Sequence, residues 1–339
     1  MPRKKLLNLA VAAAVGCVAA ASAAPAMASV TINGAGSTLV APLEGEWATA
    51  FDSTNGDTVT YQAVGSGTGI TDITHHLVDF GASDAPLSSL QQQQCPDCVV
   101  VPWAVSATGI GYNLSGIGRV RLTPSTLAGI YLGQITKWND PRITSTNKGE
   151  HFPNETITPI FRTDGSGDTY AFTNYLSHVS NTWKSRVGTG TQVAFPAPHG
   201  SGAKGNSGVT SLMESVPGSI AYIAVSYLFA RRLPAASLRN AAGNWEKPNL
   251  RSIQNAANTV HHIGSDGVSI VDPPKSAKIA YPISTFTYAI VHSNVSLAVK
   301  QFIKFAIGPN GQQFAAGLDF ASLPKIVVNE AKSALNQIH

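Results

Sequence analysis

The sequence predicts an α/β fold with two domains, and three observations lead to this prediction. The chain has 339 residues, a length that suits two ordinary domains. Hydrophobic residues make up 43% of it, so a substantial core can form. Short β-rich runs alternate with helical segments along the chain, which is typical of α/β proteins with mainly parallel sheets.

The expected strands are short runs rich in β-branched and apolar residues, at 30–32, 58–62, 99–101, 109–112, 157–161, 220–223 and 286–291. The last run is almost continuously apolar or β-prone. This pattern predicts a strand that is buried on both faces.

Helices are expected between these strands. Two apolar sets share the spacing i, i+4, i+7 and i+8, which places each set on one face of a helix. These sets are Leu43, Trp47, Ala50 and Phe51, and Ala298, Phe302, Phe305 and Ala306. Two further helices are expected at 70–78 and 170–176.

The N-terminus has the pattern of an export signal. Arg3, Lys4 and Lys5 precede an apolar stretch at 6–24, and Ala26-Met27-Ala28 fits a small-x-small cleavage site. We therefore expect residues 1–28 to be a signal peptide and the mature protein to be exported to the periplasm or the cell surface. A transmembrane anchor is the less favoured interpretation, because the segment is alanine-rich and only weakly apolar.

A lipoprotein processing site at Val15-Gly16-Cys17 is an open alternative, although Ala14 stands where leucine is usual. Under this alternative, Cys17 would carry a lipid. No later segment reaches the roughly 18 apolar residues that a membrane span needs.

The charge of the chain argues against nucleic-acid binding. Of 23 basic side chains, three lie in the predicted signal peptide, which leaves 20 against 19 acidic ones. No basic stripe remains on the mature chain.

The remaining cysteines form the motif Cys95-Pro96-Asp97-Cys98. In a cytosolic protein this motif would indicate redox or metal chemistry, but in an exported one we expect a local disulfide. A zinc site would need further ligands at a suitable spacing. The adjacent pairs His75-His76 and His261-His262 do not provide them, because neighbouring residues do not share a helix face. We therefore expect no metal site.

Three glycine-rich loops, at 34–38, 65–69 and 162–170, each follow an expected strand and precede an expected helix. A helix N-terminus leaves backbone N–H groups unpaired and carries partial positive charge. Glycine lets an anion approach such a terminus, and serine or threonine adds a hydroxyl donor. Any one of these loops could equally be only a turn with a helix cap.

Other motifs for anions and catalysis are absent. The sequence has no Gly-x-x-x-x-Gly-Lys-Ser/Thr loop, no complete Gly-x-Gly-x-x-Gly fingerprint in the first two glycine-rich loops and no Gly-x-Ser-x-Gly elbow. We expect a protein that is not an enzyme and needs no cofactor.

Seven segments then occur in an order that indicates a family: "GAGSTLVAP", "VDFGASDAPLS", "YLGQITKWNDPRI", "RTDGSGDTYAFTNYL", "WKSRVGTG", "GAKGNSGV" and "PGSIAYI". Together they resemble the phosphate-binding proteins of high-affinity phosphate ABC transporters. The similarity spans about residues 31–328, which is nearly the whole mature chain.

The resemblance implies a bilobed periplasmic-binding-protein fold of the Venus-flytrap, type II class, with the ligand between two α/β lobes. Lobe I would hold residues 29–108 and 284–339, and lobe II would hold 112–279. The chain would cross between the lobes near 107–112 and 280–286.

The resemblance also implies the ligand-binding residues. They are Thr38, Leu39, Ser66, Asp84, Arg162, Asp164, Ser166, Gly167 and Asp168. Arg162 would bind the anion, and Asp164 would orient Arg162. Asp84 would accept a proton from the ligand, which favours protonated phosphate over sulfate, an acceptor-only anion.

This sequence departs from the family at two of these positions. Leu39 stands where phenylalanine is usual, and only its backbone N–H is needed. Asp168 replaces a threonine, so its carboxylate would either face the anion or cap the helix, and Thr169 could provide the hydroxyl instead. If Asp168 faces the ligand, it would favour the more protonated form of phosphate.

The function implied by the resemblance is capture of inorganic phosphate outside the cytoplasmic membrane by a monomer, for delivery to an ABC permease. Two alternatives stay open. The first is binding of another oxyanion or of a small phosphorylated molecule, which Asp168 suggests. The second is an exported phosphatase-like enzyme, although the sequence shows neither a nucleophile with its base nor a metal-ligand set.

Overall fold

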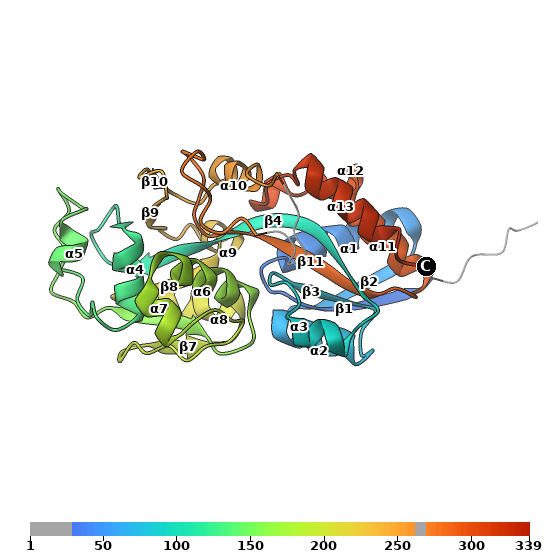
Figure 1. Cartoon of the computed structure of the whole chain (residues 1–339), viewed down its shortest axis with the longest axis horizontal. Helices are drawn as coiled ribbons and strands as arrows, with labels where there is room; N and C mark the ends of the chain where they lie inside the picture. Colours follow the sequence, from blue (N-terminus) through green and yellow to red (C-terminus); the bar gives the residue numbers. More distant parts are fainter. Residues whose placement is uncertain (1–28, 262–268) are drawn as a thin grey trace, which may run out of the picture.

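The computed structural model of the protein describes residues 29–261 and 269–339, so the predicted signal peptide and Cys17 lie outside the described residues. The described chain is an elongated α/β molecule whose helices flank a long curled sheet (Figure 1). None of its helices is both long enough and apolar enough to cross a membrane.

The main sheet of the described residues has eight strands in the order β2-β1-β3-β11-β4-β8-β6-β7. Their bounds are β1 Thr31–Gly36, β2 Thr58–Gln62, β3 Phe80–Ser83, β4 Cys98–Asn113, β6 Thr158–Arg162, β7 Ser201–Ala203, β8 Ser219–Ala224 and β11 Ser284–His292. A small second sheet has the order β10-β9-β5, with β5 Arg121–Leu122, β9 Ser237–Arg239 and β10 Trp245–Glu246.

The expectation of mainly parallel pairing is wrong at the centre of the sheet. The pairs of β1 with β2 and β3, and of β6 with β7 and β8, are parallel. In contrast, β11 runs antiparallel to β3 and β4, and β4 runs antiparallel to β8. The expected two-sided burial of β11 is confirmed, because all nine of its residues are buried.

Strand β4 joins the two halves of the sheet. Two strands were expected at 99–101 and 109–112, but residues 98–113 form one strand of 16 residues. Its residues 98–107 pair with β11, and its residues 108–113 pair with β8. Figure 1 shows β4 as a long arch from one end of the molecule toward the other.

The helices cover both faces of the sheet (Figure 1). Their bounds are α1 Ala41–Asn55, α2 Ser66–Thr74, α3 Ser89–Gln94, α4 Pro124–Tyr131, α5 Pro141–Thr144, α6 Gly167–Val179, α7 Asn181–Arg186, α8 Gly205–Ser215, α9 Val225–Ala230, α10 Leu250–Ala257, α11 Leu297–Ile307, α12 Pro309–Gln312 and α13 Lys325–Leu335, with a 3₁₀ turn at Ala316–Leu318.

The two largest hydrophobic clusters of the described residues lie on the two sides of β4 and pack these layers together. On the side of β1–β3, Trp47 of α1 and Phe302 of α11 pack with Trp103 of β4 in one buried cluster. On the side of β6–β8, Tyr131, Phe172 and Tyr222 form another, in which the rings of Phe172 and Tyr222 stack 4.5 Å apart. The expected apolar faces of α1 and α11 therefore point into the core.

The first glycine-rich loop differs from its expected form. Gly34 and Gly36 belong to β1, and α1 begins only at Ala41. Glycine is needed at residue 34 because a Cβ there would lie 2.0 Å from Cζ of Phe80. The second loop already forms the first turn of α2, which ends at Thr74 because His76 adopts a left-handed φ of 56°.

Candidate functional site

The three glycine-rich loops meet near the middle of the main sheet. The N–H of Gly65 donates to the carbonyl of Gly36 at 2.8 Å, which joins the second loop to the first. The N–H of Gly67 donates to the carbonyl of Gly165 at 2.9 Å, which joins the second loop to the third. The loops therefore form one connected cluster, with polar side chains directed into it.

Asp84, directly after β3, has its carboxylate inside this cluster and is only 2% exposed. The hydroxyl of Ser37 lies 2.6 Å from both carboxylate oxygens, and Ser66 Oγ accepts the N–H of Asp84 at 3.2 Å. Burial, and next the charge of Asp168, raise the pKa of Asp84 to about 7. Asp84 can therefore donate or accept a proton near neutral pH.

Arg162 ends β6 and is held by Asp164. Its Nε donates to Asp164 Oδ1 at 2.7 Å and its Nη2 donates to Oδ2, so the pair is bidentate. Burial acts to raise the pKa of Asp164, but the hydrogen bonds and charge of Arg162 lower it below its usual value. The expected orienting contact between Asp164 and Arg162 is thus present.

Asp168 points into the cluster, on the first turn of α6. Its Oδ1 accepts from Thr108 Oγ1 at 2.7 Å, and its Oδ2 accepts from Asn206 Nδ2 at 2.6 Å and from Arg162 Nη1 at 3.3 Å. Burial raises its pKa, against the opposing effect of Arg162. The alternative in which Asp168 only caps the helix is wrong, because Ser166 Oγ caps α6 by accepting the N–H of Thr169 at 3.2 Å.

Thr38 and Leu39 lie at the end of the first loop. Thr38 Oγ1 accepts hydrogen bonds from the side-chain Nδ2 and the backbone N–H of Asn206, at 2.9 and 3.3 Å. The N–H of Leu39 donates to Ser37 Oγ at 3.0 Å, and its side chain is buried in the core beside α1. Leucine in place of phenylalanine is therefore a change within the core.

Gly167 brings the third loop against Asp84. Its N–H donates to Ser66 Oγ at 3.1 Å, and a Cβ at this position would lie 2.4 Å from Cβ of Asp84. Thr169, the alternative hydroxyl donor, instead has its Oγ1 2.8 Å from the hydroxyl of Tyr222. All nine expected residues lie in or beside this one cluster.

The chain is similar to known proteins over most of its length. A family model described as a PBP superfamily domain matches residues 20–310. The phosphate-binding protein PstS of Xylella fastidiosa strain 9a5c is 36% identical, over 90% of this chain and 85% of its own length. That of Pasteurella multocida is 34% identical, over 89% of both chains.

The chain belongs to the PstS family.

Solved structures extend the comparison to the fold of this PstS-family chain. A high-affinity periplasmic phosphate-binding protein called PfluDING, solved with phosphate, has a TM-score of 0.70 at 21% identity and covers 90% of this chain and 93% of its own. The phosphate-binding protein of Stenotrophomonas maltophilia has a TM-score of 0.68 at 18% identity, covering 90% and 94%. These likenesses confirm the bilobed α/β fold.

The sequence analysis did not identify three further residues of this cluster: Ser37, Thr108 and Asn206. Ser37 and Asn206 lie inside segments that carried the family resemblance, "GAGSTLVAP" and "GAKGNSGV", so that signal was available. Thr108 lies within a strand and has no local motif. Its importance follows only from the approach of β4 to α6, which brings its hydroxyl to Asp168.

Proposed function

We propose that this PstS-family protein captures inorganic phosphate outside the cytoplasmic membrane and delivers it to an ABC permease. The observation that carries the proposal is a buried arginine, fixed by Asp164, in the same cluster as Asp84, whose pKa is raised toward neutrality. Such a site suits an anion that also carries protons.

Arg162 would provide the positive charge. Its side chain is only 1% exposed, and its contacts to Asp164 and Asp168 use three of the five N–H groups of a guanidinium. The remaining N–H groups would bind two phosphate oxygens, since the planar fork matches such an anion. Thr38, Ser66 and the backbone N–H groups of Leu39 and Gly167 would complete the shell, once these two N–H groups exchange their present acceptors, Ser37 Oγ and Ser66 Oγ, for phosphate oxygens.

Asp84 would select phosphate against sulfate. Its carboxylate would accept a hydrogen bond from a protonated phosphate oxygen, whereas sulfate would face it with lone pairs only. Where Asp84 is ionised, the penalty with sulfate would be the repulsion between the facing lone pairs in a buried site, because the hydrogen bond from Ser37 Oγ is already present and does not separate the two anions. Discrimination by such a repulsive contact reaches about 10⁴-fold in other polar sites.

We further propose that lobe I comprises residues 29–108 and 284–339 and lobe II residues 112–279, with crossings near 107–112 and 280–286. Contacts between Ser66 and Gly167, and between Thr38 and Asn206, would then join the lobes across the ligand. Opening would follow a hinge at these crossings. The protein would act as a monomer, without catalysis, cofactor or nucleic acid.

The predicted signal peptide supports export to the periplasm or cell surface. Cleavage after Ala28 and lipidation at Cys17 are the two routes that the sequence leaves open.

The position of Asp168 favours one second candidate, a binder of another oxyanion or of a small phosphorylated molecule. Asp84, Asp164 and Asp168 place three carboxyl groups beside Arg162, so its single positive charge cannot neutralise all of them when they are ionised.

Calorimetric titration of the ligand-stripped protein with phosphate and then sulfate, at pH 6 and pH 8, separates these functions. Tight one-to-one binding of phosphate without heat from sulfate is expected. Folded protein that gives no phosphate heat at either pH would overturn the proposal and favour the second candidate.

A further inference from the structure

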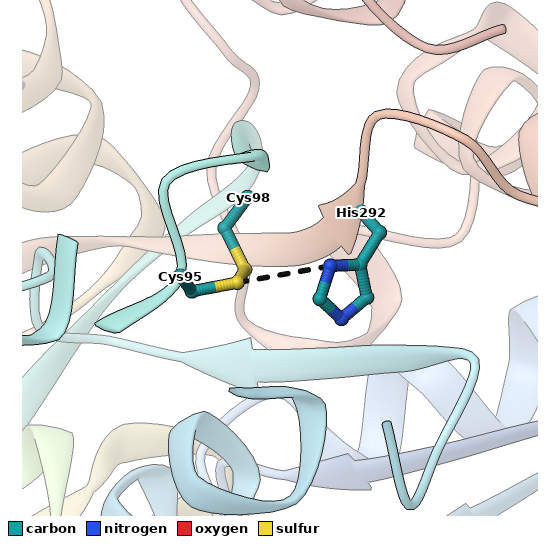
Figure 2. A group of neighbouring side chains, drawn as sticks. All are labelled: Cys95, Cys98 and His292. Atoms are coloured by element: carbon teal, nitrogen blue, oxygen red, sulfur yellow. Dashed lines mark hydrogen bonds between the residues drawn. A yellow bond between two sulfur atoms is a disulfide. The ribbon is translucent and has the colours of Figure 1, made fainter. Parts of the chain in front are cut away.

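The disulfide between Cys95 and Cys98 lies beside a histidine from a distant part of the chain (Figure 2). The two cysteines flank the turn between α3 and β4, and His292 is the last residue of β11. His292 pairs directly with Cys98 in the antiparallel register of β11 and β4, so their side chains project on the same face. This register explains why residues nearly 200 positions apart meet.

We propose that these residues form a metal site when the disulfide is reduced. While the disulfide is intact, the two sulfurs are bonded to each other and cannot bind an ion. After reduction, Cys95 Sγ, Cys98 Sγ and His292 Nδ1 bind one zinc-class divalent cation. These three atoms all lie within 4.8 Å of one another, and Cys95 Sγ is 3.8 Å from His292 Nδ1. A tetrahedral zinc with bonds of about 2.3 Å to sulfur and 2.0 Å to nitrogen separates sulfur and nitrogen by about 3.5 Å. Cys-x-x-Cys is also a usual zinc spacing.

The histidine is already oriented for this role. Its Nε2 lies 2.8 Å from the carbonyl of Ile73, which can only accept, so Nε2 carries the hydrogen and donates. Nδ1 lies 2.9 Å from Oδ2 of the Asp97 carboxylate, which can only accept, so the cation would displace the hydrogen that Nδ1 donates to Asp97 and bind the lone pair that this leaves. A backbone carbonyl in this position is a common outer partner of metal-binding histidines.

Asp97 lies at the exposed edge of the proposed site, and the three ligands are Cys95, Cys98 and His292. Its carboxylate lies 2.9 Å from His292 Nδ1 and 3.8 Å from Cys95 Sγ. The side chain of Asp97 is half exposed, whereas Cys95 and His292 are 2% and 6% exposed. The proposed site is therefore buried around Cys95 and His292 and open to solvent on the side of Asp97, where an ion can enter.

The chemistry balances with a dithiol as reductant. Two electrons from the dithiol convert the Cys95–Cys98 disulfide to two thiols, and the dithiol becomes a disulfide. The cation then displaces one proton from each thiol and the hydrogen on Nδ1 of His292, and it binds the two thiolates and Nδ1. Sequence spacing alone did not reveal this site, because two of its ligands are close in sequence and His292 is 197 residues from Cys95.

The test uses processed protein from the exported fraction of a Cys17→Ser background, in which Cys95 and Cys98 are the remaining cysteines. The protein is reduced with dithiothreitol, desalted without oxygen and titrated with Co²⁺. We expect one equivalent to produce thiolate-to-cobalt charge-transfer and tetrahedral d–d bands, which Zn²⁺ then removes. The oxidised protein should show neither band.

Variants of the histidine decide whether the third ligand is real. His292→Ala should weaken Co²⁺ binding by at least about tenfold, since even outer partners of metal ligands are worth that much. His292→Gln should do the same while its amide can still reach the Ile73 carbonyl, which covers the case that the alanine variant fails to fold. His178→Ala is the control, because His178 is exposed and its Nδ1 lies 2.9 Å from the carbonyl of Asn174 in its own helix α6.

Three results would overturn the proposal. They are cobalt bands without thiolate charge transfer, equal Co²⁺ affinity of oxidised and reduced protein, and unchanged affinity in the folded His292→Gln variant.

Discussion

At the scale of single residues, Asp84 and Asp168 are two buried carboxyl groups that act on one another. The charge of Asp168 contributes to the raised pKa of Asp84, after burial. Both acids cannot ionise freely beside a single arginine. Asp84 should therefore keep its proton to a higher pH in this protein than it would with threonine at position 168.

Replacing Asp168 with threonine tests this coupling. The wild-type affinity for phosphate should fall between pH 6 and pH 8, because Asp84 and the ligand lose protons over that range while Asp168 adds negative charge. The Asp168→Thr variant should bind phosphate more tightly at pH 8 and show a flatter profile, measured by calorimetric titration. An identical pH profile in the two proteins would rule out a role for Asp168 in selecting the protonated ligand.

A third buried acid, Glu44 of α1, should affect the stability of the fold. It is 1% exposed, its Oε1 has no hydrogen-bond partner among the described residues, and burial raises its pKa to about 8. Between its ordinary pKa near 4.5 and 8, the folded protein holds a proton that the unfolded chain releases. Stability should therefore decrease as pH rises through this range, by at most about 1.4 kcal/mol per pH unit.

Glu44→Gln should remove this part of the pH dependence. Urea unfolding at pH 5, 6.5 and 8 would measure it, with Glu46→Gln as the control because Glu46 is exposed on the same helix. Equal slopes of stability against pH in the wild type and Glu44→Gln would contradict the assignment.

At the scale of elements, the start of α2 and the loop before α6 lie against each other through glycines. A Cβ on Gly67 would lie 2.9 Å from Cα of Gly165, closer than real Cβ contacts allow. This contact exists only when the second and third loops are together, so a side chain at residue 67 should oppose closure and leave an open molecule undisturbed.

Gly67→Ala should therefore weaken phosphate binding by about tenfold or more, since relieving such a clash costs at least about 1.4 kcal/mol. Its unfolding temperature without ligand should stay near that of the wild type, because alanine suits a helix. The matched control is Gly45→Ala in α1, where a Cβ meets nothing within 4 Å. Wild-type affinity in Gly67→Ala would show that the loops separate without loss of binding.

Elements with a local pattern were predictable from the sequence. The run 58–62 is β2 with the expected bounds, and the spacing of Trp47 and Phe51 placed them correctly in the core. Strand β4 was predicted as two separate runs, 99–101 and 109–112, and Pro102, which lacks the N–H of a strand ladder, follows the first run directly. The sheet accommodates this proline by a shift of register between Thr287 and Tyr288 of β11.

Contacts within the site were predictable only where the family resemblance marked them. Arg162 and Asp164 are two residues apart and lie in one quoted segment, so their pairing could be stated in advance. Thr108 and Asn206 reach Asp168 from 60 and 38 positions away. No local periodicity in the sequence predicts these two contacts, because they arise only when β4 and α8 pack beside the start of α6.

At the scale of the whole molecule, we expect the protein to unfold in a single cooperative transition, because strand β4 belongs to both halves of the sheet and the ligand would contact both halves. β4 pairs with both halves of the sheet, so neither half can lose it alone. Phosphate at 1,000 times its dissociation constant should stabilise the folded protein by about 4 kcal/mol, and equal sulfate should not. Calorimetric scans that show two separate transitions, or equal shifts with both anions, would contradict this expectation.

The place of β11 has a consequence for the order in which the newly made chain can fold. This strand, at 284–292, lies between β3 and β4, which are complete by residue 113. During synthesis, β3 and β4 therefore each keep one edge unpaired until β11, which is made almost last, is available. Residues 158–224 carry their own parallel strands β6, β7 and β8 and can assemble earlier. The N-terminal part of this protein should be its last to become resistant to proteases during synthesis.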